Sequence, residues 1–162
     1  MKNHYIYTRP GTTPTYMPRT VILGVIGSDA HVVGITILEQ ALSAAGFEVV
    51  NLGVQTSQGE FAAAAKSHDA EAVLVSSLYG HARQDCEGFH QRLAEAGVDV
   101  PTYVGGNLAV GQDDFEATRE TFREMGFDRV FDAETDPEEA IAALRRDLRV
   151  TTSESERVRV DS

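Results

Sequence analysis

An aspartate and a histidine stand two residues apart where an apolar run ends. Asp29 and His31 lie in GSDAHVVG, after the run TVILGVIG at 20–27 and before a stretch with helical periodicity. A neutral imidazole binds a metal well when its other ring nitrogen donates to a carboxylate, which sets tautomer and orientation. Three interpretations compete: a capped helix with an incidental histidine, a phosphate-binding loop, and a metal ligand with its orienting carboxylate.

Phosphate chemistry is disfavoured by the residues around this pair. The chain has no G-x-x-x-x-G-K-[ST] sequence, and Gly24, Gly27 and Gly34 do not form G-x-G-x-x-G.

The metal interpretation requires Asp29 and His31 to lie in a loop. Residues two apart diverge on a helix, whereas a loop can bring both side chains to one side. Because no second strong ligand follows the other strands, a metal held by this histidine alone would be labile. A cofactor that brings its own metal removes that difficulty.

Composition excludes several other classes. A chain of 162 residues suits one domain. The single cysteine, Cys86, excludes an internal disulfide and a Cys-x-x-Cys zinc cluster. The net charge of -11 argues against a nucleic-acid partner, and no apolar stretch is long enough for a signal peptide or a membrane span. We therefore expect a cytoplasmic protein that binds neither nucleic acid nor membrane.

Five short apolar runs alternate with segments of helical periodicity. The runs are typical of strands buried on both faces, at 20–27, 47–54, 71–78, 101–106 and 128–133. This alternation predicts an α/β fold, (βα)5, with a flavodoxin-like doubly wound parallel sheet of five strands in the order 2-1-3-4-5. A mononucleotide-binding Rossmann half is the alternative. Residues 20–149 form the predicted domain, and 1–19 and 150–162 are predicted to be flexible extensions.

The helix ends have recognisable signals. Ser57 and Glu60 have the spacing of a capping box, and a proline at the first helical position follows Asp136. Glycines are expected to end three helices, at Gly46, Gly97 and Gly126.

The predicted strand order indicates one crevice. In such sheets ligands bind beyond the carboxyl ends of the strands that flank the topological switch point. The first, third and fourth strands are followed by GSDAH, SSLYG and GGNLAVG, which are small, polar or glycine-rich. The ends of the second and fifth, GVQTS and DAETD, are expected to form ordinary turns into capped helices.

Three motifs then resemble a known family. SDAHVVG has the form D-x-H-x-x-G, SSL the form S-x-L, and GG follows at 105–106. Together they resemble the cobalamin-binding domains that hold the cofactor base-off with histidine on cobalt. Over 20–149 the chain is similar to the small subunits of methylaspartate mutase, also called glutamate mutase. The similarity includes VILGVIGSDAHVVG, AEAVLVSSLYG and YVGGNLAVG.

The resemblance implies an activity. It implies an adenosylcobalamin-dependent isomerase that interconverts L-glutamate and (2S,3S)-3-methylaspartate by a radical carbon-skeleton rearrangement. The small subunit would be inactive without the large (epsilon) subunit, in a heterotetramer of two small and two large subunits. Two other corrinoid functions stay open: the cobalamin-binding part of an acyl-CoA-type mutase, and the corrinoid protein of a methyltransferase system. A flavodoxin-like interaction module is the alternative outside cobalamin chemistry.

The resemblance also implies residue roles. His31 would be the axial cobalt ligand and Asp29 its hydrogen-bonded support. The other implied cofactor-binding residues are Ser28, Ala30, Val32 and Gly34 around the corrin face, Ser76, Ser77 and Leu78 lining a slot for the nucleotide tail, and Gly105, Gly106, Asn107, Leu108, Ala109, Val110 and Gly111 as its far wall. No residue of this chain, Cys86 included, is expected to be catalytic beyond cofactor ligation.

Overall fold

A parallel sheet forms the centre of the computed structural model. The structure describes residues 6–7, 15–16, 19–27, 33–77, 82–106, 108 and 114–160, with side chains for 19–27, 35–77, 82–106, 108 and 114–148. The strands are β3 (Thr20–Val25), β4 (Glu48–Asn51), β5 (Ala72–Ser77), β6 (Thr102–Gly106) and β7 (Arg129–Phe131). They pair in parallel in the order β4-β3-β5-β6-β7, which confirms the predicted doubly wound sheet.

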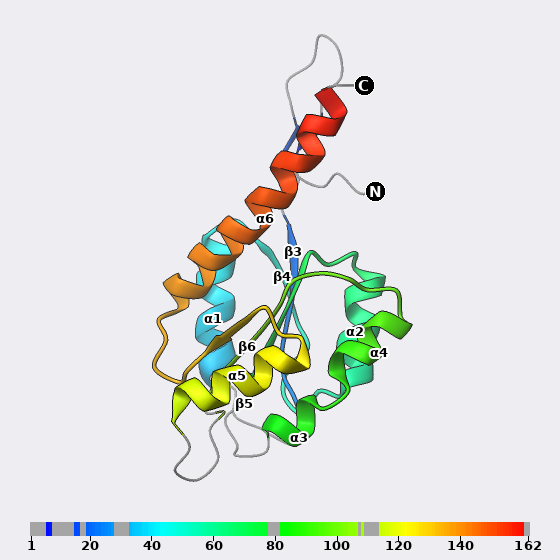
Figure 1. The fold of residues 1–162 in the computed structure, drawn as a ribbon. Helices are drawn as coiled ribbons and strands as arrows, with labels where there is room; N and C mark the ends of the chain where they lie inside the picture. The colour runs from blue at the N-terminus through cyan, green and yellow to red at the C-terminus, as the bar shows by residue number, and fades with distance from the viewer. Residues whose placement is uncertain are drawn as a thin grey trace.

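Helices cover both faces of the sheet (Figure 1). Val21, Leu23 and Val25 of β3 pack in a cluster with α1 and α6, whereas Ile22 and Ile26 pack in a second cluster with α2, α4 and α5. This alternation follows from the two-residue period of a strand. The helices are α1 (Val33–Ala44), α2 (Gln58–Ser67), α3 (Ala82–Cys86), α4 (Phe89–Glu95), α5 (Phe115–Met125) and α6 (Pro137–Val160).

One predicted helix is broken in two. The segment DCEGFHQRLAEAG at 85–97, which ends at the expected helix end Gly97, has the periodicity of one helix, but α3 ends at Cys86 and α4 begins at Phe89. Gly88 between them has a φ of 78°, a left-handed conformation that suits glycine. The side-chain amide of Gln58 donates to the Asp85 and Glu87 carbonyls at 2.7 Å each. These bonds satisfy carbonyls that the helix break leaves free.

The terminal segments contain backbone structure that the sequence did not predict. Two short strands, β1 (Ile6–Tyr7) and β2 (Thr15–Tyr16), pair antiparallel within 1–19. Helix α6 continues past the expected boundary at 149 to Val160. No glycine or proline follows Pro137, so the sequence has none of the usual signals that end a helix. The flexibility of the two ends stays a prediction.

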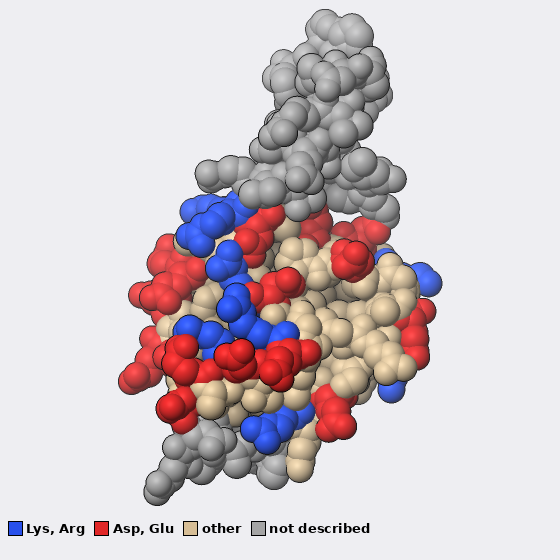
Figure 2. Space-filling model, in the orientation of Figure 1, with Lys and Arg blue, Asp and Glu red and all other residues tan. Residues whose placement is uncertain are grey.

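Charged side chains are mixed on the visible surface. On the face drawn in Figure 2, Asp and Glu side chains border the Lys and Arg side chains. The chain as a whole has a net charge of -11, so its long-range field is negative.

The capping box of α2 is present as predicted and provides a stability test. The Glu60 amide donates to Ser57 Oγ at 3.1 Å, and the Ser57 amide donates to Glu60 Oε1 at 2.9 Å. Ser57→Ala leaves the Glu60 amide without its acceptor, so we expect the free energy of unfolding to fall by about 1 kcal/mol in urea titrations. Ser67→Ala, at the exposed end of the same helix, is the control. An equal loss in both variants would contradict the role of the cap.

Candidate binding site

The carboxyl ends of three strands meet at one edge of the sheet. Ser76 pairs with Val25 of β3 on one side and with Gly105 of β6 on the other, and Ser77 pairs with Gly106. The Ile26 amide donates to the Ser76 carbonyl at 3.0 Å. The structure therefore brings together the strand ends that precede the three sequence motifs.

Part of the predicted site lies outside the described residues. These positions are Ser28, Asp29, Ala30, His31, Val32, Leu78, Asn107, Ala109, Val110 and Gly111. Both flanks of the Asp29–His31 segment are described. Gly27 donates its amide to the Thr56 carbonyl at 2.9 Å, and α1 begins at Val33, with Gly34 in its first turn. The segment is thus joined at both ends to the edge where Ser76 and Gly105 lie.

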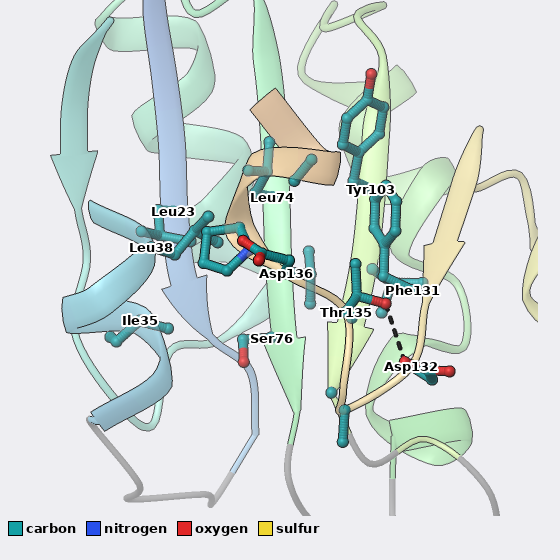
Figure 3. A pocket seen from close by; sticks show the side chains of 17 residues that line it. Leu23, Ile35, Leu38, Leu74, Ser76, Tyr103, Phe131, Asp132, Thr135 and Asp136 are labelled. Carbon is teal, nitrogen blue, oxygen red and sulfur yellow. Dashed lines mark hydrogen bonds between the residues drawn. The ribbon is translucent and has the colours of Figure 1, made fainter. Parts of the chain in front are cut away.

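A pocket of about 160 Å³ lies at this edge, on the face of the sheet that α1 and α6 cover (Figure 3). Leu23 and Leu38 stand on one side of it, and Tyr103 and Phe131 stand on the other. The two aromatic rings make an edge-to-face pair, with centroids 5.7 Å apart. The lining is completed by Ile35, Leu74, Val75, Ser76, Val104, Gly105, Gly106, Asp132, Ala133, Thr135, Asp136, Pro137 and Ala140.

The pocket's size and lining suit a flat aromatic group. An apolar cavity of about 150 Å³ accommodates benzene, so this pocket has room for an aromatic ring. Aliphatic side chains on one side and aromatic side chains on the other provide apolar contact for such a ring. The Ser76 hydroxyl is a polar group at the pocket that can hydrogen-bond a ring nitrogen.

The turn after β7 leads into a capped helix, as predicted, and it also lines the pocket, which was not predicted. Asp132 Oδ1 accepts from the Thr135 hydroxyl at 2.9 Å and from the Glu134 amide at 3.0 Å. Asp136 Oδ1 accepts from the Glu138 amide at 3.0 Å and so caps α6. These bonds make a compact turn that places Asp132, Thr135 and Asp136 at the pocket. The signal available in the sequence was DAETDP, a polar turn directly after a buried strand.

Neighbouring predicted residues face opposite sides of the sheet. Ser76 lines the pocket, whereas Ser77 is 0% exposed and faces the other helical layer. The Ser77 hydroxyl has no hydrogen-bond partner among the described residues. Leu108 is buried in the cluster with α2, α4 and α5, away from the pocket. The two-residue period of a strand explains why Ser76 and Ser77 of β5 face opposite sides.

Tyr103, a residue that sequence analysis missed, belongs to a charged cluster beside the pocket. Its phenol donates to Asp147 Oδ2 of α6. Arg129 of β7 binds the same carboxylate through both oxygens, at 2.9 and 2.7 Å. Burial raises the pKa of Tyr103, and the hydrogen bonds from Arg129 lower the pKa of Asp147. The phenol therefore stays a donor and the carboxylate stays charged at neutral pH.

Other candidate reactive groups lie away from the pocket. Cys86 is buried, and burial raises the pKa of its thiol to about 12, which makes it a poor nucleophile. His90 Nε2 lies 2.8 Å from the Thr102 hydroxyl, at the opposite end of β6 from the site. Within the described part of the chain, no three His, Cys, Asp or Glu side chains are placed to hold a metal ion. No helix there is long and apolar enough to cross a membrane.

Comparison with known proteins defines the class. The family model "B12 binding domain" matches residues 19–142. A solved structure of a cobalamin-binding protein from Desulfitobacterium hafniense is similar with a TM-score of 0.65 and 21% identity, covering 80% of this chain and 58% of that one. This likeness shows the fold. The chain is thus a B12-binding domain with the pocket at the carboxyl edge of its sheet.

Sequence relatives give the family. Glutamate mutase sigma subunit 1 of Haloarcula marismortui is 81% identical over 149 residues, which cover 92% of this chain and 99% of the relative. The glutamate mutase sigma subunit of Carboxydothermus hydrogenoformans is 58% identical over 129 residues, covering 79% of this chain and 94% of the relative. This chain belongs to the glutamate mutase sigma subunit family, which confirms the resemblance seen in the motifs.

Proposed function

We propose that this chain is the cobalamin-binding small subunit of a glutamate mutase. With a large subunit it would form an isomerase that interconverts L-glutamate and (2S,3S)-3-methylaspartate. The observation that supports this best is the pocket beside the flanks of the Asp29–His31 segment, at the ends of β3, β5 and β6. Family membership supports the reaction class.

The residues at the pocket fit the nucleotide tail of a base-off cobalamin. Its heteroaromatic base would lie between Leu23 and Leu38 on one side and Tyr103 and Phe131 on the other. Gly105 has no side chain to fill this space, and the Ser76 hydroxyl can bind a ring nitrogen. Outside the described residues, His31 would hold cobalt through one ring nitrogen while Asp29 accepts from the other.

The cofactor, this chain and the large subunit would have different roles in the reaction. Adenosylcobalamin, when bound, supplies radical chemistry through its cobalt–carbon bond. The residues of this chain would orient the cofactor and exclude water from its tail. The substrate site would belong to the large subunit, in a heterotetramer of two small and two large subunits. A cytoplasmic location is part of the proposal, in keeping with the single cysteine.

Two corrinoids test the proposal. The full chain is titrated with cobalamin and with cobinamide, a corrinoid that lacks the nucleotide tail, and binding is followed by absorbance. We expect cobalamin to bind more tightly, because only cobalamin can fill the pocket. Glutamate turnover should require adenosylcobalamin and a large subunit together. Equal affinity for both corrinoids would overturn the assignment of the pocket, and turnover of an acyl-CoA substrate in place of glutamate would overturn the reaction.

A further inference from the structure

The cluster of Tyr103, Arg129 and Asp147 ties three elements together at the side of the pocket. Tyr103 comes from β6, Arg129 from β7 and Asp147 from α6. Tyr103 is 2% exposed, and the side chains of Arg129 and Asp147 are 31% and 24% exposed. The guanidinium carbon of Arg129 also lies 6.0 Å from the centre of the Tyr103 ring, within range of a cation–π contact.

Helix α6 links this cluster to the pocket. Pro137 and Ala140 line the pocket, and Asp147 lies seven residues after Ala140 on the same face of the helix. At a rise of 1.5 Å per residue, Asp147 lies about 10 Å along the helix from Ala140. The cluster therefore fixes α6 to the sheet about 10 Å from the pocket lining. The position of Asp147 on the sheet therefore contributes to how far Ala140 stands from Leu74 and Tyr103.

The hydrogen bonds of Asp147 fix the position of α6 along the sheet, which apolar packing alone would not do. Ile141, Leu144 and Leu148 also pack α6 against the sheet, but apolar contact is non-directional and tolerates sliding. Sliding toward an empty apolar pocket would bury more surface and close it. A carboxylate that binds a buried phenol and a guanidinium in one geometry opposes that movement, because leaving either partner unpaired is costly.

We propose that Asp147 and Arg129 are positioning residues that act through Tyr103 to keep the nucleotide-tail pocket open and its aromatic wall in place before the cofactor binds. This inference rests on the proposed function, because it takes the tail of a corrinoid as the occupant. It adds to the motif residues a set of residues that shape the pocket for the nucleotide tail and do not bind cobalt.

The test compares corrinoids with and without the tail. Tyr103→Phe removes one oxygen and keeps the ring, and Asp147→Asn keeps the shape of the side chain and removes its charge. We expect each variant to bind cobalamin about tenfold more weakly and to bind cobinamide as the wild type does, since cobinamide places nothing in the pocket. The double variant should lose less than the sum of the two single losses, because both changes weaken the same three-residue cluster.

Controls separate positioning from stability. Glu116→Gln breaks another ion pair, the 3.0 Å contact with Arg119 on α5, and should change neither affinity. Thermal unfolding defines a temperature at which every variant is folded, and titrations are made there. A variant that weakens both corrinoids equally, or that leaves cobalamin affinity unchanged, overturns the inference. If the wild type itself does not prefer cobalamin to cobinamide, the pocket assignment fails first and the inference fails with it.

Discussion

Gly106→Ala is expected to lower the free energy of unfolding by about 3 kcal/mol or more. Gly106 has a φ of 116°, which an alanine adopts only with strain. A methyl group there would lie 2.0 Å from the Ser77 carbonyl oxygen and 2.9 Å from its carbon. Both atoms belong to the backbone of β5, so the strands would have to separate to make room. Urea unfolding followed by circular dichroism measures the loss.

Gly105→Ala is the matched control, and we expect it to leave the stability unchanged. A methyl group on Gly105 would meet Phe131 Cβ at 3.5 Å, an ordinary contact, so Gly105→Ala should fold with a stability close to that of the wild type. Gly105 lines the pocket, and the added methyl group takes up part of its volume. We therefore expect weaker binding of cobalamin and unchanged binding of cobinamide. A Gly106→Ala protein as stable as Gly105→Ala would contradict the tight pairing of β5 and β6.

His31→Ala is expected to remove the protein's nitrogen from cobalt. In the wild type loaded with cob(II)alamin, in the presence of the large subunit, the hyperfine splitting of the EPR spectrum should change when histidine is labelled with nitrogen-15. In His31→Ala that sensitivity to the label should disappear. Glutamate turnover should fall by about 100-fold or more, since even the loss of a supporting residue costs a metal site 10- to 100-fold.

His68→Ala is the control for the histidine label. His68 is exposed at the end of α2, and its removal should leave both the spectrum and the turnover unchanged. Splitting in the wild type that does not respond to the histidine label would show that the nitrogen comes from the cofactor's own base. Corrinoid binding unaffected by His31→Ala would also contradict the assignment.

The motifs at the ends of β5 and β6 show how much of the site could be predicted from the sequence. Apolar runs and glycines at 71–78 and 101–106 predicted the strands and their adjacency, and the register pairs Ser76 with Gly105 and Ser77 with Gly106. The motif could not tell that only one serine faces the pocket. That depends on which face α1 and α6 cover, and helix placement is set by packing over the whole sheet.

The sequence alone predicted the features that short-range patterns of residues encode. Periodicity, capping residues and turn residues predicted the strands, the helices and the Ser57–Glu60 cap, because these depend on residues close together in sequence. The strand order followed from the arrangement that five alternating strand–helix units most often adopt. Tertiary structure decided the break at Gly88, the part that the Asp132–Asp136 turn plays in the pocket, and the bond between Tyr103 and Asp147. Tyr103 and Asp147 are 44 residues apart, and no local pattern links them. Their contact exists because the turn after β7 leads α6 back against the sheet, where Asp147 meets Tyr103 of β6.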